Sequence, residues 1–207
     1  ETGNAYTVTL NDAADAALAA TDLSTLGGKT TGVVTVSNAV TITGDAAQVT
    51  AALVTADTLV VAGTAKVTVT GTIGVAEVNA IAAKTTGVVT ATISTNGATA
   101  LVAGLLDTTE NAYTIAVTGT ATAAELNTIN SKTSVVADAS GVTAITGDAA
   151  SFATLVAAAS SPNATITLKA DVTATVSDAM TVTAANALAA LTTGVVTATL
   201  TTGGLAS

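Results

Sequence analysis

The chain has 207 residues, with a formal net charge of −9, five basic residues, and neither histidine nor cysteine. Binding to nucleic acid or to an anionic membrane surface is disfavoured, because phosphate groups require clustered cations. Ser-His-Asp triads, thiol nucleophiles and conventional zinc or haem sites are excluded by the missing residue types.

Hydrophobic residues make up 49% of the chain and aromatic residues 1%, so it is expected to fold around a core of small side chains. The longest uncharged stretch, residues 85–106, has the length of a membrane span. It is interrupted by threonine, serine, asparagine and glycine, so we predict no membrane insertion. Residues 1–3 are interpreted as a remnant of expression or of signal cleavage, and the chain as a fragment of a longer protein.

One hexapeptide, KTTGVV, recurs along the chain. It occupies residues 29–34 and 84–89, and altered copies stand at residues 132–136 (KTSVV) and 192–196 (TTGVV). Internal repeats of this kind indicate an array of similar structural units. Each period contains two alternations of threonine with an aliphatic residue, and an alanine-rich stretch follows each alternation.

The first period shows the expected elements in chain order. Residues 33–44 alternate between aliphatic and polar positions, which predicts a half-exposed strand. Residues 45–57 place apolar side chains at helical spacing and predict a helix. Residues 58–72 return to the strand pattern, and residues 74–83 return to the helical one. Residues 141–159 then repeat the strand-to-helix sequence almost position for position.

Several helix starts carry capping residues. Thr122 and Glu125 have the spacing of a capping box, in which each side chain bonds the backbone of the other residue. Asp45 and Asp148 follow glycine in a shared TGDAA sequence. We expect both carboxylates to cap the helices that they precede, because the positive end of the helix dipole favours an anion.

The KTTGVV motif has the residues of a helix end. Lys29 and Lys84 are expected at helix C-termini, where the helix dipole favours a cation. Gly32 and Gly87 would then break the chain before the next strand. We therefore interpret KTTGVV as a structural corner between units and not as a binding motif.

The alternation of strands and helices predicts an α/β fold. A strand that continues through a helix into the same sheet requires parallel pairing and a right-handed crossover. About eight coils of roughly 20–30 residues predict one right-handed α/β solenoid over residues 1–207. Parallel strands lie about 4.8 Å apart, whereas helices pack at about 8–10 Å. The strands are therefore expected on the inner face of a curve and the alanine-rich helices on its outer face.

Candidate catalytic carboxylates are dispersed along the chain. Three groups lie close in sequence, namely Asp12 with Asp15, Asp107 with Glu110, and Asp171 with Asp178. Paired carboxylates can act as acid and base, but active-site pairs are usually set among aromatic and polar residues. Because aromatic residues are scarce here, we predict that the chain is not an enzyme and has no catalytic residue and no cofactor.

Calcium is the remaining metal candidate, because it binds carboxylate and carbonyl oxygens. The chain has neither an EF-hand loop nor the glycine-rich nonapeptide of calcium-binding β-helices. Asp45, Asp57, Asp138 and Asp148 are therefore interpreted as caps and solubilising charges, and no metal site is predicted. Asn163 begins an Asn-x-Thr glycosylation sequon, whose use depends on the expression host.

Pairs of threonines separated by one residue recur in the expected strands. They are Thr7/Thr9, Thr41/Thr43, Thr68/Thr70, Thr90/Thr92, Thr165/Thr167, Thr173/Thr175, Thr181/Thr183 and Thr197/Thr199. Alternation places both members of a pair on one strand face, and stacked coils would align the pairs into ladders. The pattern is similar to the threonine arrays of ice-binding solenoids. Threonine is also a good residue for the solvated face of any strand, and we favour this simpler interpretation.

The alanine, threonine and valine repeats, with KTTGVV corners and helices of the AAELNTIN type, resemble very large secreted or surface proteins of marine cyanobacteria. The resemblance covers nearly the whole chain. It implies a bacterial origin, an extracellular or cell-surface location, and a stalk, surface-layer or adhesin-like role.

The leading functional hypothesis is a structural repeat segment. The chain would be a monomeric rigid spacer whose contacts are the neighbouring repeats of its parent chain. The alternative is a binding module that uses the strand face to hold a protein or a glycan, as horseshoe solenoids do, with ice as a less favoured ligand.

Overall fold

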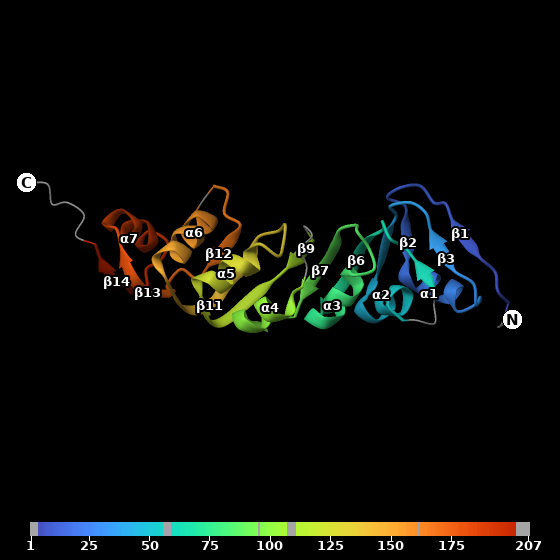
Figure 1. The fold of residues 1–207 in the computed structure, drawn as a ribbon, viewed down its shortest axis with the longest axis horizontal. Coiled ribbons are helices and arrows are strands. Elements are labelled where there is room, and N and C mark those ends of the chain that lie inside the picture. Colours follow the sequence, from blue (N-terminus) through green and yellow to red (C-terminus); the bar gives the residue numbers. More distant parts are fainter. Residues whose placement is uncertain (1–3, 56–58, 95, 107–110, 161, 202–207) are drawn as a thin grey trace, which may run out of the picture. The chain divides into compact units, whose positions relative to one another are not determined.

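The computed structural model describes residues 4–55, 59–94, 96–106, 111–160 and 162–201. Within these residues the chain forms seven helices and three sheets in which every recorded strand pair is parallel (Figure 1). The predicted α/β class is therefore confirmed. In the same described residues, no helix has the length and hydropathy that a membrane crossing requires.

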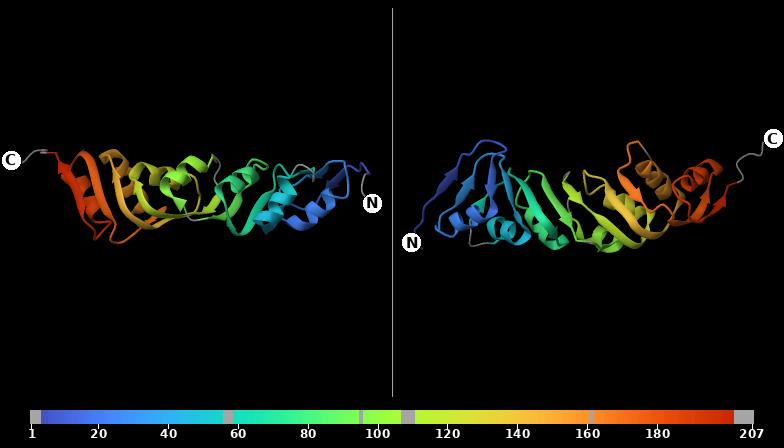
Figure 2. Two further views of the ribbon diagram at one scale, coloured as in Figure 1. Left: turned by 90° about the horizontal axis from the view of Figure 1, so that it is seen from below. Right: turned by 180° about the vertical axis from the view of Figure 1, so that it is seen from behind.

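The fold divides into two compact units. Unit 1 contains residues 1–94 and 105–113, and unit 2 contains residues 95–104 and 114–207. Within each unit, consecutive helices pack side by side and cover one face of the strands (Figures 1 and 2).

Unit 1 contains two sheets. Its elements are β1 (Val8–Leu10), β2 (Ala17–Ala19), α1 (Ala20–Gly27), β3 (Val34–Val36), β4 (Thr41–Asp45), α2 (Ala46–Leu53), β5 (Val60–Val61), β6 (Lys66–Ile73), α3 (Val75–Ala82), β7 (Val89–Ile93) and β9 (Ala112–Thr114). The strand orders β2-β4-β6-β7-β9 and β1-β3-β5 both follow the order of the chain. Successive coils therefore add one strand at a time to the same growing edge.

Unit 2 repeats this scheme around a single sheet. Its elements are β8 (Asn96–Gly97), α4 (Ala98–Gly104), β10 (Ala116–Thr122), α5 (Ala123–Asn130), β11 (Ala137–Gly147), α6 (Ala149–Ala159), β12 (Ile166–Leu168), β13 (Thr173–Met180), α7 (Val182–Ala189) and β14 (Val196–Leu200). The strand order is β8-β10-β11-β13-β14, and β12 pairs with the first part of β11. The long strand β11 thus pairs with two strands of the following coil, β12 and β13.

The core of each unit lies between helices and strands. In unit 1, Val49 of α2 and Ile81 of α3 are fully buried, as is Ile42 of β4. In unit 2, Phe152 and Leu155 of α6 are fully buried as well. Helical spacing of the apolar residues explains why one side of each helix is buried, and the period of two explains the strands.

Two predicted strands are each split into two. The segment 33–44 forms β3 and β4, which belong to different sheets. Asn38 lies at the bend between them and donates from Nδ2 to the carbonyl oxygen of Asp12 at 2.7 Å. The segment 58–72 divides in the same way into β5 and β6, with a turn in which Ala65 N donates to Ala62 O at 3.1 Å. Alternation continues across both bends, so the sequence pattern did not reveal them.

The predicted helices are confirmed with small changes at their ends. Helix α2 begins after Asp45 and α3 begins after Gly74. Lys29 and Lys84 directly follow the C-cap residues of α1 and α3, as expected from the helix dipole.

The repeated corner motif binds each coil to the coil before it. The first threonine of the motif donates from Oγ1 to a carbonyl oxygen of the preceding coil and accepts from the glycine N–H two residues later. These bonds join Thr30 to Tyr6 at 2.6 Å and to Gly32 at 3.0 Å, Thr85 to Ala65 at 2.5 Å and to Gly87 at 3.0 Å, and Thr192 to Val172 at 2.6 Å and to Gly194 at 2.9 Å. The same two hydrogen bonds therefore recur at all three of these corners.

The glycine of the motif is required by close packing and not by a helix cap. A Cβ added at Gly32, Gly87 or Gly194 would lie 2.3 to 2.4 Å from a carbonyl oxygen of the preceding coil. None of the three has a positive φ, and the helices before them end with cap residues in right-handed conformation. The sequence-based explanation of these glycines as helix breakers was therefore wrong, although the motif is a structural corner as predicted.

Candidate functional site

Three of the six acidic residues considered for catalysis have structural partners. Asp15 Oδ1 pairs with Lys66 Nζ at 2.7 Å, and Asp171 Oδ1 pairs with Lys169 Nζ at 2.8 Å. Asp178 Oδ1 accepts from the backbone N–H of Ala149, the first residue of α6, at 2.6 Å. Asp107 and Glu110 lie outside the described residues. Within the part of the chain that the structure describes, no three acidic, histidine or cysteine side chains gather in a way that could hold a metal ion.

The predicted caps at Asp45 and Asp148 are confirmed. Asp45 Oδ1 accepts from Gln48 N at 2.8 Å, and Asp148 Oδ1 accepts from Ser151 N at 2.7 Å. The bond from the Ser151 backbone, followed by that from its hydroxyl, lowers the pKa of Asp148. Helix α6 therefore has two carboxylates at its positive end, one from its own coil and Asp178 from the next.

Asp138 is not a helix cap. It lies in β11, where Oδ1 accepts from Ser140 N at 2.9 Å. The pKa of Asp138 is lowered first by the hydroxyl of Ser140 and then by its backbone N–H. Asp57, the fourth acid considered, falls outside the described residues.

The threonine ladders form within the sheets of both units. In unit 1, Thr43, Thr68 and Thr90 lie opposite one another on β4, β6 and β7. In unit 2, the ladder runs through Thr122, Thr146, Thr175 and Thr197 on β10, β11, β13 and β14. We call these four residues the threonine ladder of unit 2. Neighbouring members of a ladder are separated by about 4.8 Å, the spacing of paired strands.

A second row of threonines, further along the same strands than the ladders, is interrupted by bulges. The pairing of β6 with β7 changes register between Thr68 and Thr72, where Gly71 has φ 76°. A similar shift in β10 falls at Gly119, whose φ is 87°. Glycine adopts these left-handed angles at little cost. The threonines after the bulges therefore do not continue a regular two-row array.

Three of the predicted threonine pairs lie elsewhere. Thr181 is the N-cap of α7 and Thr183 is inside that helix, so the prediction of a strand pair there was wrong. Thr9 pairs with Thr35 in the separate three-stranded sheet of unit 1. Thr165 precedes β12 and its Oγ1 accepts from Asn130 Nδ2 at 3.0 Å.

A polar pocket of about 420 Å³ adjoins the start of the threonine ladder of unit 2. Its lining residues are Thr99, Thr120, Ala121, Thr122, Glu125, Ala144 and Thr146. The Glu125 carboxylate accepts from Thr99 Oγ1 at 2.6 Å and from the backbone and hydroxyl of Thr122 at 2.8 and 2.9 Å. These bonds confirm the predicted capping box.

The Glu125 carboxylate is stabilised in its charged form. The hydroxyl of Thr99, followed by the backbone N–H of Thr122, lowers the pKa of Glu125. The pocket therefore offers an anionic acceptor between hydroxyl groups that can donate or accept. This set of groups can bind a hydroxylated ligand.

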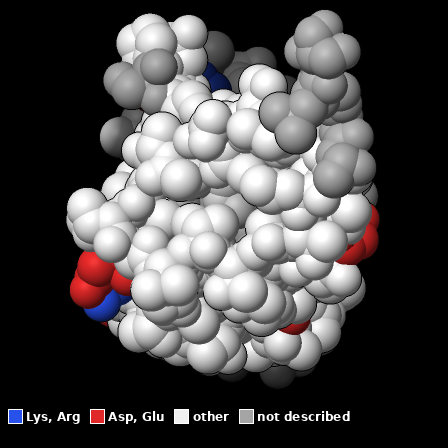
Figure 3. Space-filling view, turned by 90° about the vertical axis from the view of Figure 1, so that its left-hand side faces the viewer, with Lys and Arg blue, Asp and Glu red and all other residues white. Residues whose placement is uncertain are grey.

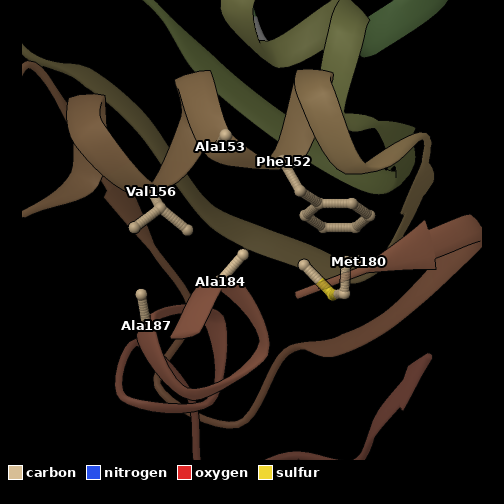
Figure 4. Close-up of a pocket in the computed structure, with 6 residues that line it drawn as sticks. All are labelled: Phe152, Ala153, Val156, Met180, Ala184 and Ala187. Atoms are coloured by element: carbon tan, nitrogen blue, oxygen red, sulfur yellow. The ribbon is translucent and has the colours of Figure 1, made fainter. Parts of the chain in front are cut away.

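A second, apolar pocket of about 210 Å³ lies between the last two helices. Phe152, Ala153 and Val156 of α6 face Ala184 and Ala187 of α7, and Met180 of β13 lies below the phenylalanine ring (Figure 4). Neighbouring helices pack farther apart than paired strands. The short alanine side chains do not fill the space that this difference leaves. No local sequence pattern marks this pocket, because its walls come from two separate helices, α6 and α7.

The sequon residue Asn163 is exposed and precedes β12. Comparison with protein-family models, curated proteins and solved structures finds no match to this chain.

Proposed function

We propose that the chain is a structural repeat segment of a bacterial cell-surface or secreted protein and acts as a rigid spacer. In this proposal the strand-and-helix units form one right-handed α/β solenoid of about eight coils. The strands lie on the inner face of a curve, the helices lie on the outer face, and the neighbouring repeats of a parent chain are the partners. The proposal assigns the chain no catalytic role.

The observation that carries the proposal is the repeated bond between successive coils. At three corners the same Thr-Thr-Gly sequence joins a coil to the backbone of the preceding coil. Strand order follows chain order in both units, so each coil depends mainly on its neighbours. Several acidic side chains have structural contacts: three cap helices and two form ion pairs. They are Asp45, Asp148 and Asp178, and Asp15 and Asp171, respectively.

The cell-surface location is part of the proposal and depends on the resemblance to cyanobacterial repeat proteins. The net charge of −9 and the many exposed threonines are compatible with a hydrated, repulsive surface. Antibody labelling of intact source cells tests it directly, and signal confined to permeabilised cells would contradict a surface location.

Small-angle scattering tests the spacer shape. A compact globule of 207 residues has a radius of gyration of about 17 Å, and we expect a clearly larger value for the monomer. A value near that of the compact globule would contradict an extended array.

Rigidity requires a second measurement. Because the chain has no cysteine, dyes can be attached at two introduced cysteines, Tyr6→Cys and Thr183→Cys, both at exposed positions. We expect a narrow distribution of transfer efficiencies that does not change with salt. It should correspond to a distance between the dyes of more than about 45 Å, roughly the diameter of a compact globule of this length. A broad distribution would show a flexible linker instead of a rigid spacer.

A second candidate function is a binding module that uses the threonine ladder of unit 2. The specific observation in its favour is the polar pocket at Glu125, which continues the ladder with further hydroxyl groups. A glycan array and a protein-interaction screen test this alternative, with Thr146→Val as the variant that should lose binding. Thr90→Val on the ladder of unit 1 is the matched control. Ice is the least favoured ligand, because bulges break the second threonine row, and a measurement of thermal hysteresis tests it.

A further inference from the structure

The apolar pocket between α6 and α7 lies where two positions that are polar in several other helices are both alanine. The third residue after the N-cap is Gln48 in α2, Glu77 in α3 and Glu125 in α5. In α7 this position is Ala184, which lines the pocket. The long side chain that completes a capping box in the other three helices is therefore absent from this wall.

The facing position on α6 shows the same loss. Asn79 of α3 and Asn127 of α5 each stand five residues after the N-cap, and both bond to the following coil. Asn79 Oδ1 accepts from Leu106 N at 3.2 Å, and Asn127 Nδ2 donates to Ser151 O at 2.9 Å. In α6 the residue at this position is Ala153, which has no group to bridge the gap. Because the structure describes both helices in full, the pocket follows from these alanines and not from a missing neighbour.

The pocket has a buried floor and an open mouth. Phe152 is completely buried and Met180 is 3% exposed, and the phenylalanine ring lies over the methionine side chain (Figure 4). Ala153 and Ala187 are exposed and lie at the mouth. The volume is about 210 Å³. A cavity of about 150 Å³ with similar apolar walls is large enough to bind benzene.

The walls and their surroundings favour an uncharged ligand. All the lining residues are apolar, and α7 contains no acidic or basic residue. Figure 3 views the adjoining end of unit 2, where acidic and basic side chains lie only towards the rim. A charged ligand would lose its hydration in the pocket without gaining a partner. Asp148 and Asp178, which both bond to the beginning of α6, would in addition repel an anion.

We propose that this pocket is a binding site for a small, uncharged aromatic molecule about the size of toluene. An aromatic ring would contact the Phe152 ring and the Met180 sulfur, and both kinds of contact are favourable beyond the burial of apolar area. Methionine is also adaptable in shape, so it can adjust to the bound ring. The site lies between helices of unit 2 and does not involve the threonine ladder, so it is independent of the spacer proposal.

Met180 is a direct probe of this site, because the chain contains a single methionine. Protein labelled with carbon-13 at the methionine methyl group should therefore give one methyl signal in NMR spectra. Toluene in the pocket should shift this signal through its ring current, and the shift should saturate with a Kd of about 1 mM or tighter. Benzoate has the same ring and a negative charge, and it should bind at least about tenfold more weakly.

Two variants fill the pocket from opposite walls. Ala184→Glu gives α7 the capping box that Thr122 and Glu125 form in α5, so it should fold and should weaken toluene binding at least about tenfold. Ala153→Leu fills the space from α6 and should also weaken binding. Thr183→Glu adds the same charge at an exposed position of α7 and should leave the Kd unchanged. Circular dichroism confirms that all three variants are folded.

Three results would overturn the inference. Absence of a saturable shift up to the solubility limit of toluene would show that the pocket does not bind an aromatic ring. Equal Kd values for toluene and benzoate would contradict an apolar site. Binding that survives both Ala184→Glu and Ala153→Leu would place the ligand elsewhere. Scattering and dye transfer test the spacer proposal separately, so failure of one proposal does not imply failure of the other.

Discussion

Replacing Gly87 with alanine tests whether the corner motif joins one coil to the next. The added Cβ would lie 2.3 Å from the carbonyl oxygen of Ala65 and 2.6 Å from its carbonyl carbon. Ordinary contact begins at 3.4 Å, so the two coils must separate locally by about 1 Å. This movement stretches the bond from Thr85 Oγ1 to Ala65 O and the bond from Thr86 N to Gly63 O, which measure 2.5 and 2.9 Å.

The expected destabilisation follows from these losses. Two weakened hydrogen bonds cost about 0.5–1.5 kcal/mol each, and an overpacked contact costs about 1–3 kcal/mol. We expect Gly87→Ala to lower the free energy of unfolding by about 2–6 kcal/mol, measured by urea denaturation with circular dichroism.

Gly63→Ala is the matched control for this prediction. A Cβ at Gly63 meets nothing within 4 Å, and its φ is not positive. We expect its free energy of unfolding to change by less than about 0.5 kcal/mol or to rise slightly. If Gly87→Ala is as stable as Gly63→Ala, the close approach at the corner does not hold the coils together, and the physical explanation of the motif fails.

Three further predictions concern the corners, the capping box and the core. Thr192→Val should lower the free energy of unfolding by about 1–3 kcal/mol, because the carbonyl of Val172 loses its 2.6 Å bond, whereas Thr192→Ser should retain most of the stability in the same urea titration. Hydrogen bonds lower the pKa of Glu125 below 4.5, so its contribution to stability is complete above that pH and is lost as the pH falls through the lower, folded-state pKa. Glu125→Gln should therefore be less stable than the parent chain at pH 7, and the difference should shrink at pH 2–3; a difference independent of pH would contradict this. Phe152→Ala should lower the free energy of unfolding by about 3–5 kcal/mol in the same urea titration and enlarge the apolar pocket. A decrease of less than about 1 kcal/mol would show that neighbouring side chains fill the cavity and would contradict this prediction.

Much of the local structure was predictable because single residues determine it. Asp45 and Asp148 each precede an alanine-rich stretch, and an acceptor at that position satisfies free backbone donors whatever surrounds the helix. The pairing of Thr122 with Glu125 depends only on a separation of three residues. The parallel sheets also followed from the alternation of elements, since short strands joined through helices leave little choice of direction.

The sites were less predictable because distant residues build them. Asp178 caps α6 from the following coil, and the two residues are separated by 29 positions. The polar pocket joins Thr99 of α4 to Glu125 of α5, and no local pattern marks that pairing. Thr181 illustrates the opposite error, since a strand-like alternation there hides an N-cap.

By itself, the sequence determined the α/β class, most helix starts and the alternation of buried and exposed strand positions, because these depend on short-range spacing and on backbone donors within one turn. Only the tertiary structure decided why glycine is required at the corners and where the strands change sheet. Those features depend on how closely one coil approaches another. Residues about 20–30 positions apart set that distance, and a spacing rule for neighbouring residues does not contain it.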